Sequence, residues 1–226
     1  LDEVIQQFED RDYPLSIGGG PVGFFGSLRY LMGEVKLFTS YYDDPDLVKH
    51  IINDLVDFWI QLWTPILSRI EVDWVNMWED MCYKTGPLIS PAIFREFMLP
   101  PYKKFTSFLK DMGVKHIIVD TDGRCWNLIP LFLEGGVTGL WPMEVAAGMD
   151  VVEVRKRYAN LQILGGIDKR MLARGKKEID EELEGKIPFM LKRGGYVPHV
   201  DHLIPPDVSL ENFVYYRNRL ESYQAR

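Results

Sequence analysis

Carboxylates and histidines recur in this sequence directly after short apolar segments that are typical of β-strands. Side chains of these types transfer protons and bind metal ions near neutral pH. Because the carboxyl ends of parallel strands open on one face of a barrel, groups far apart in sequence are expected to converge there. The pattern therefore predicts an enzyme active site. The candidate residues are Glu79, Asp80, Asp120, Asp122, Glu144, Asp168, Asp201 and His202.

The composition indicates one globular domain over residues 1–226 and argues against several kinds of partner. Hydrophobic residues make up 46% of the chain and charged residues 26%, which is enough apolar surface for a sizeable core. The net charge of -7 argues against general affinity for nucleic acid or anionic membranes, because both are negatively charged. No apolar stretch approaches the roughly 20 residues of a membrane span. Cys82 and Cys125 form no C-x-x-C motif, so we expect a reducing, cytoplasmic environment.

The elements that must position these side chains alternate between strands and helices. About six strands are expected, over residues 15–17, 72–78, 115–120, 137–141, 161–164 and 196–200. Helices are expected after residues 43–45, after Ser90, and over residues 102–112, 126–134, 151–158, 176–192 and 209–223. In the first of these helices, the inward apolar face is expected to consist of Leu47, Ile51, Leu55, Phe58, Leu62 and Ile66.

This alternation predicts an α/β fold with a parallel sheet, and in particular a TIM-type (β/α)8 barrel. A doubly wound sheet is disfavoured, because the glycine-rich turn at residues 18–21 lacks the G-x-G-x-x-G phosphate-binding pattern. A complete barrel has eight strands. We therefore expect this chain, which starts with leucine, to lack about two N-terminal β/α units and to hold the C-terminal two-thirds of the fold.

Several ordered motifs resemble the uroporphyrinogen decarboxylase superfamily. They are Leu-Ile-Ser-Pro at residues 88–91, Leu-Pro-Pro-Tyr at 99–102, Asp-Gly at 122–123, Gly-Gly-Ile-Asp at 165–168 and His-Leu-Ile-Pro-Pro-Asp at 202–207. The resemblance covers roughly residues 18–220 and implies a (β/α)8 barrel. It also implies one of two activities. These are decarboxylation of uroporphyrinogen in porphyrin biosynthesis, and methyl transfer between a small substrate and a cobalamin-type corrinoid carrier.

The resemblance also suggests a metal site. His202 falls where decarboxylases of the superfamily carry an active-site histidine and where its zinc methyltransferases carry a metal-binding cysteine. Asp120 and Asp122 fall on the two ligand positions of a His-x-Cys-Gly zinc motif found in thiol-activating methyltransferases. Two carboxylates and one imidazole would accept zinc or another divalent metal. The structural alternative is that Asp122 caps the following helix.

A catalytic role is predicted for one further residue, and substrate contacts for three. Glu79 lies where decarboxylases of the superfamily carry a tyrosine or a short polar-glycine stretch near the tetrapyrrole. The alternative for Glu79 is a salt-bridged residue at the rim. Trp78 and Trp141 lie close enough to strand ends to wall a pocket for a flat ligand, and Glu144 lies beside them. The predicted catalytic set is Glu79, Asp120, Asp122 and His202, and the predicted substrate-binding set is Trp78, Trp141 and Glu144.

Other candidate residues have structural alternatives. Asp168 could cap the helix that starts near residue 169, and Glu144 could pair with a neighbouring base. Only one parity of the last strand end points into the barrel, so an inward His202 disfavours His199. His116 begins a strand and is expected to be structural. His50 is expected on the solvent side of a helix.

Methyl transfer is the favoured function. An acidic rim suits a metal ion or a neutral methylated substrate better than uroporphyrinogen, which carries many carboxylates. The expected substrate is a small methylated compound, such as a methoxylated aromatic, with a metal or a proton held against its heteroatom. The sequence contains no D-x-H-x-x-G cobalamin-binding motif, so the corrinoid is expected on a separate partner protein.

Two alternatives remain open. Uroporphyrinogen decarboxylation uses the same fold and needs neither a metal nor another cofactor. A non-catalytic, truncated barrel that binds a partner is the third hypothesis. Exposed strand edges seek partners, so this last hypothesis predicts self-association into a homo-oligomer.

Overall fold

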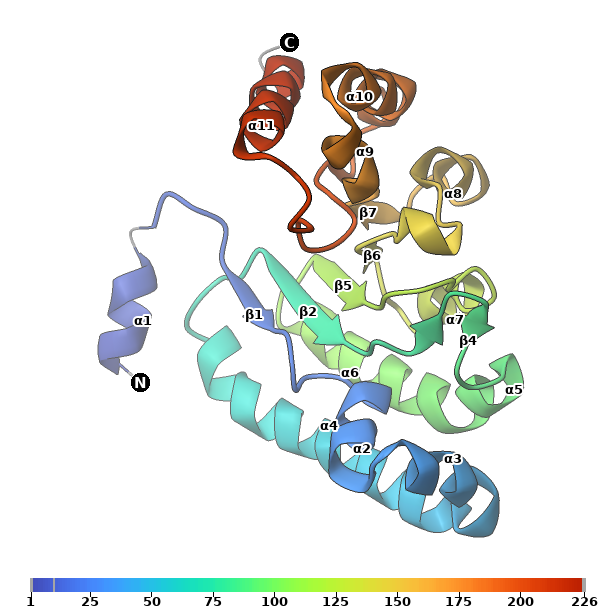
Figure 1. The fold of residues 1–226 in the computed structure, drawn as a ribbon. Coiled ribbons are helices and arrows are strands. Elements are labelled where there is room, and N and C mark those ends of the chain that lie inside the picture. The colour runs from blue at the N-terminus through green and yellow to red at the C-terminus, as the bar shows by residue number, and fades with distance from the viewer. Residues whose placement is uncertain (1, 10, 225–226) are drawn as a thin grey trace. The chain divides into compact units, whose positions relative to one another are not determined.

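The computed structural model describes residues 2–9 and 11–224 of the chain. These residues divide into two units, which we describe separately. Unit 1 comprises Leu1–Met81, Pro87–Asp120 and Trp126–Thr138, and unit 2 comprises Cys82–Gly86, Thr121–Cys125 and Gly139–Arg226. Each unit carries three parallel strands with helices between them (Figure 1). The predicted α/β alternation is therefore confirmed, whereas closure into a barrel and the missing N-terminal units stay predictions.

The sheet of unit 1 runs in the order β1 (Ser16–Gly18), β2 (Trp74–Trp78) and β5 (His116–Asp120). The three central residues of β5 are buried, as expected for a strand that is covered on both faces. The register places Trp78 opposite Asp120, so two strand ends that carry predicted site residues lie side by side. The helices of this unit are α1 (Asp2–Glu9), α2 (Phe25–Met32), α3 (Glu34–Asp43), α4 (Pro45–Leu67), α5 (Pro91–Ile93), α6 (Leu99–Asp111) and α7 (Ile129–Glu134).

Helix α4 begins where predicted but buries a different face. Asp44 caps it by accepting a hydrogen bond from the Leu47 backbone N–H, and Pro45 occupies its first turn. The predicted inward stripe is wrong: Leu47, Phe58 and Leu62 are exposed. The buried face lies one residue further along and consists of Val48, Ile52, Val56, Trp59, Trp63 and Leu67. Both stripes have helical spacing, and the observed one buries two indole rings, which contribute the larger apolar area.

The prolines at 100 and 101 interrupt the helix that follows Ser90, as predicted. A π-helical segment, Phe94–Met98, joins α5 to α6. Proline has no backbone N–H to donate and its ring crowds the preceding turn, so a regular helix cannot run through this point.

The sheet of unit 2 runs in the order β6 (Gly139–Trp141), β7 (Gln162–Leu164) and β8 (Tyr196–Val197). Strand β8 is shorter than predicted because Pro198 has no N–H for the ladder. One parallel bridge, between Ile167 and Val200, continues the pairing. A 3-10 turn, Val145–Ala147, follows β6, and the helices are α8 (Val151–Arg157), α9 (Lys169–Arg174), α10 (Lys176–Leu191) and α11 (Leu210–Gln224).

The last three helices of unit 2 share an apolar core, formed by Ile167, Leu172, Ile179, Leu183, Ile187, Tyr216 and Leu220. The remaining strands, β3 (Cys82–Tyr83) and β4 (Gly86–Pro87), form a separate two-stranded ribbon. Within the described ranges, no helix has the length and apolarity to cross a membrane.

Candidate functional site

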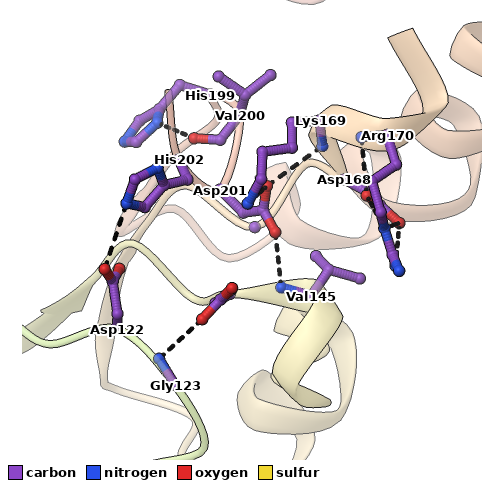
Figure 2. Close-up of polar contacts among 12 residues, drawn as sticks. Asp122, Gly123, Val145, Asp168, Lys169, Arg170, His199, Val200, Asp201 and His202 are labelled. Carbon is purple, nitrogen blue, oxygen red and sulfur yellow. Dashed lines mark hydrogen bonds and ion pairs between the residues drawn. The ribbon is translucent and has the colours of Figure 1, made fainter. Parts of the chain in front are cut away.

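Asp122 and His202 are far apart in sequence but meet in unit 2. His202 Nε2 lies 3.3 Å from Asp122 Oδ2 (Figure 2). The side chain of His202 is 43% exposed and that of Asp122 is 34% exposed, so a ligand can reach both from solvent. A carboxylate beside an imidazole orients the ring and stabilises its protonated form, which is the arrangement of a general acid–base pair.

A tight turn at Gly123 sets the position of Asp122. The φ angle of Gly123 is +76°, and a Cβ at this residue would come within 2.6 Å of the Cys82 carbonyl carbon. Glycine is therefore required here. The Gly123 N–H donates to Glu144 Oε2 at 3.0 Å, which connects Asp122 to the segment that follows β6.

The alternative role for Asp122 as a helix cap is wrong. The next helix in sequence, α7, has Leu128 as its N-cap residue and receives no side-chain capping bond. A capping residue directly precedes the helix that it caps, and Asp122 lies well before that point.

Glu144 also lies in a strained segment. Met143, directly before it, has a φ of 59°, which is rare for a residue with a side chain, and is buried. Backbone strain of this kind is often found at functional sites, where the surrounding structure holds it in place. The turn after β6 is thus a rigid support for Glu144. The sequence also allowed Glu144 to pair with a basic side chain. The structure instead shows the Glu144 carboxylate accepting a hydrogen bond from the Gly123 N–H.

Asp201, directly before His202, is fully buried and bonded to two segments. Its Oδ2 accepts from the Val145 N–H at 2.8 Å and its Oδ1 from the Lys169 N–H at 3.2 Å (Figure 2). The Lys169 ammonium lies 3.5 Å from the same Oδ1 and balances the buried charge.

Asp168 caps a helix, which is the structural role that the sequence allowed for it. It caps α9 through the Arg170 N–H at 3.0 Å and pairs with the Arg170 guanidinium. Burial raises the pKa of Asp168, but the hydrogen bonds from Arg170 outweigh burial and hold the pKa below its usual value. The Asp168 backbone N–H donates to Glu182, which in turn pairs with the buried Lys186.

The side chains of His199 and Trp141 contact each other in unit 2. Their rings lie edge to face with centroids 5.9 Å apart. Burial lowers the pKa of His199, so its imidazole is neutral at pH 7, and its Nδ1 lies 2.6 Å from the Val200 carbonyl oxygen. A neutral ring that donates from Nδ1 keeps Nε2 as an acceptor. The substrate-binding role of Trp141 stays a prediction.

Glu79 lies in unit 1 in a fully enclosed environment. Its carboxylate accepts from the Phe24 and Gly26 backbone N–H groups, each at 3.0 Å, and from the Tyr102 hydroxyl. Burial raises the pKa of Glu79, although these hydrogen bonds oppose the rise. The carboxylate thus satisfies N–H groups at the start of α2, whose N-cap residue Phe24 makes no side-chain capping bond. The salt-bridged rim position is not what the structure shows, and the catalytic role stays a prediction.

The other predicted residues of unit 1 lie next to Glu79 in the sequence or in the sheet. Asp120 ends β5, and its carbonyl oxygen accepts from the Glu79 N–H at 2.9 Å. Trp78 stacks against Tyr30, with ring centroids 5.2 Å apart, and the Arg29 guanidinium lies over the Trp78 ring. Arg29 also pairs with Asp80 at 2.7 Å. Tyr30 and Arg29 were not predicted, because nothing in their local sequence indicates a contact with a distant strand.

Neither unit by itself holds three of the predicted metal ligands. In the part of the chain that the structure describes, no three His, Cys, Asp or Glu side chains are grouped so that they could hold one. Asp122 and His202 supply two donors in unit 2, whereas Asp120 belongs to unit 1. A bound zinc or other divalent metal stays a prediction for Asp120, Asp122 and His202.

Two histidines lie where the sequence places them. His50 is on the exposed surface of α4 and pairs with Asp54 at 3.4 Å. His116 begins β5. Neither belongs to unit 2.

Comparison with known proteins gives one family and one similar structure. The sequence profile described as "Uroporphyrinogen decarboxylase (URO-D)" matches residues 10–223, and no curated protein matches the chain significantly. A solved structure, the methyltransferase from Methanosarcina mazei, is similar with a TM-score of 0.67 and 16% sequence identity. The similarity covers 97% of this chain but 62% of that one, so this chain spans less than two-thirds of its length. At this identity the likeness shows the fold alone, but the profile covers nearly the whole sequence. The chain belongs to the uroporphyrinogen decarboxylase family.

Proposed function

We propose that this chain catalyses methyl transfer from a small methylated substrate to a corrinoid on a partner protein. The observation that carries the proposal is the solvent-accessible Asp122–His202 pair in an acidic setting. A methoxylated aromatic is the substrate class that we would test first. The Methanosarcina mazei protein, which has a similar fold, is named a methyltransferase. We propose the same class of reaction for this chain.

The charges of unit 2 support a neutral substrate. The sequence offers Arg124, Lys169 and Arg170 as cations for substrate carboxylates. Lys169 and Arg170 are paired with Asp201 and Asp168, and Arg124 is exposed. A substrate with many carboxylates would have to compete with these internal partners and approach Asp122 as well. That approach costs electrostatic free energy.

In the proposed reaction, His202 donates a proton to the substrate oxygen as the bond between that oxygen and the methyl carbon breaks. With a methoxylated aromatic, the protonated oxygen leaves as a phenol, which is a better leaving group than a phenoxide. Asp122, 3.3 Å from His202 Nε2, orients the His202 ring. The corrinoid, when bound on its partner, supplies the electron pair that takes the methyl group. We derive no step through a metal ion, because the described side chains do not group around one.

Uroporphyrinogen decarboxylation is the second candidate, and the matched family profile is the observation that favours it. His202 would then protonate the carbon that loses CO2, and the reaction would need no cofactor. The non-catalytic partner-binding hypothesis has no comparable support.

Paired assays with purified protein distinguish these functions. We expect methylcobalamin to form from cob(I)alamin and a methoxylated aromatic, and His202→Gln or Asp122→Asn to reduce the rate about 100-fold or more. The chain supplies a matched control, since His50 and Asp54 form the same kind of ion pair on the surface of α4. His50→Gln and Asp54→Asn should leave the rate unchanged. Release of CO2 from uroporphyrinogen without methyl transfer would favour the second candidate.

A further inference from the structure

The candidate site of unit 2 is held by a closed ring of contacts. His202 pairs with Asp122, the neighbouring Gly123 N–H bonds to Glu144, and the neighbouring Val145 N–H bonds to Asp201. Asp201 precedes His202 in the chain and so closes the ring (Figure 2). Three peptide links and three non-covalent contacts therefore fix the position of His202 relative to Asp122.

Asp201 has the properties that this ring requires. It is fully buried, and its two oxygens accept from two different segments, Val145 at 2.8 Å and Lys169 at 3.2 Å. Its own N–H donates to the Ile167 carbonyl at 2.8 Å. A buried carboxylate bonded to rigid backbone donors cannot turn without losing these bonds, and losing them is costly in a medium of low dielectric.

His202 needs such support because its side chain is 43% exposed. The two residues that follow it, Leu203 and Ile204, are exposed as well. Packing alone therefore does little to fix the ring, whereas a general acid must be held close to the proton acceptor.

We propose that Asp201 is a positioning residue that holds His202 against Asp122 through the Val145 and Lys169 backbone N–H groups. The proposal rests on the proposed function only for the role of His202 as a proton donor. The position itself can be measured without turnover.

Asp201→Asn tests the proposal directly. An amide has one acceptor oxygen, so one of the two N–H donors is left facing an NH2 group. We expect the imidazole signals of His202 to shift or broaden in NMR spectra of the folded protein. The chain has four histidines, so His202→Gln identifies the signals of this ring. If methyl transfer occurs, kcat should fall by up to about 100-fold with KM little changed.

Asp168→Asn is the matched control. Asp168 is also a buried aspartate that bonds the first turn of α9, but its hydrogen bonds do not include Val145. Its substitution should lower the melting temperature and leave the His202 signals in place. A purely structural role for Asp201 would make the two variants behave alike.

Val145→Pro provides a second test if Asp201→Asn does not fold. Val145 is the first residue of the 3-10 turn, where proline is tolerated, and Glu144 has the extended backbone that proline prefers before it. The change removes only the N–H that bonds Asp201, and Val145→Ala retains that N–H as the control. We expect the His202 signals to move in Val145→Pro alone.

Two outcomes would overturn the proposal. One is an unchanged His202 spectrum in folded Asp201→Asn and Val145→Pro. The other is failure of both variants to fold while Asp168→Asn folds, which would assign Asp201 to the fold alone. If wild-type protein shows no methyl transfer but the spectra move as expected, the proposed function fails and the positioning role stands.

Discussion

At the scale of single residues, the site depends on a few side chains and on backbone groups that hold them. Residue types and strand ends indicated Asp122 and His202, and the structure brings them to 3.3 Å. The backbone donors Gly123 and Val145, which anchor Glu144 and Asp201, could not be predicted. Every residue except proline has an N–H, and its direction depends on the turn that the folded chain adopts.

Gly123→Ala should disrupt the site more than a comparable glycine change. A Cβ at Gly123 would come within 2.7 Å of the Cys82 carbonyl oxygen, and the backbone has a φ of +76°. We expect a loss of unfolding free energy of about 2–4 kcal/mol, from strain and overpacking together, and loss of activity. Gly148→Ala is the control, because its φ is +83° with no atom within 4 Å of the added Cβ. It should cost about 1 kcal/mol in chemical denaturation. Equal losses in the two variants would contradict the account.

Glu79→Gln should change how stability depends on pH. Burial raises the pKa of Glu79 above 4.5 in the folded protein, so the folded state keeps this proton to higher pH than the unfolded chain does. The contribution of Glu79 to stability therefore falls as pH rises from about 4.5 through the folded-state pKa.

Glutamine has one acceptor oxygen, so it cannot accept from both the Phe24 and the Gly26 N–H groups. Below about pH 4.5 we therefore expect Glu79→Gln to be about 1–3 kcal/mol less stable than wild type. That difference should shrink as pH rises, as measured by urea denaturation across pH. Glu134→Gln is the control of opposite sign, because hydrogen bonds from Lys103 and Arg95 lower the pKa of Glu134. Its stabilising contribution is present above pH 4.5 and is lost as pH falls. A difference between wild type and Glu79→Gln that grows with pH would show that the carboxyl is not held protonated.

At the scale of elements, hydrophobic period and proline position predicted most strands and helices. Asp44-Pro45 marked the start of α4, and Pro100-Pro101 marked the irregular π segment. The buried face of α4 was wrong by one residue, because two parallel apolar stripes have the same period. Helices α1, α2 and α3 were missed. In α2, all four residues of the first half are buried, so this half lacks the polar face that identifies an amphipathic helix.

Two glycine-to-alanine changes in helices should have opposite effects. Alanine normally stabilises a helix interior, and Gly185 in α10 has no atom within 4 Å of an added Cβ. Gly185→Ala should raise the unfolding free energy by about 0.5–1 kcal/mol. Gly26 in α2 would bring its Cβ within 2.6 Å of the Trp78 carbonyl oxygen. Gly26→Ala should therefore lower stability by about 1–3 kcal/mol. Thermal melts that show stabilisation by both would mean that α2 does not lie against the end of β2.

At the scale of the whole molecule, the sequence motifs identified the family correctly, because they are spread over nearly the whole chain. The reaction is harder to predict. The family profile names one chemistry and the similar structure another, and both can use a histidine that donates a proton. The choice rests on charge at the site, where Lys169 and Arg170 already pair with Asp201 and Asp168.

Sedimentation tests the non-catalytic alternative at this scale. That hypothesis predicts self-association through exposed strand edges. We expect an enzyme whose sedimentation coefficient does not change with concentration, together with measurable turnover. Concentration-dependent association without turnover would support the partner-binding role. Elemental analysis of the same samples tests the predicted metal, whose content should fall in Asp122→Ala and His202→Ala if these residues bind it.

The most direct test of the central claim follows a labelled methyl group. Purified protein is incubated with cob(I)alamin and methoxylated aromatics that carry the isotope in the methoxy carbon. We predict that label appears in methylcobalamin at equal rates with wild-type protein and with His50→Gln, and about 100-fold more slowly or not at all with His202→Gln. The account is contradicted if no label reaches cobalamin from any of these substrates while the same protein releases CO2 from uroporphyrinogen.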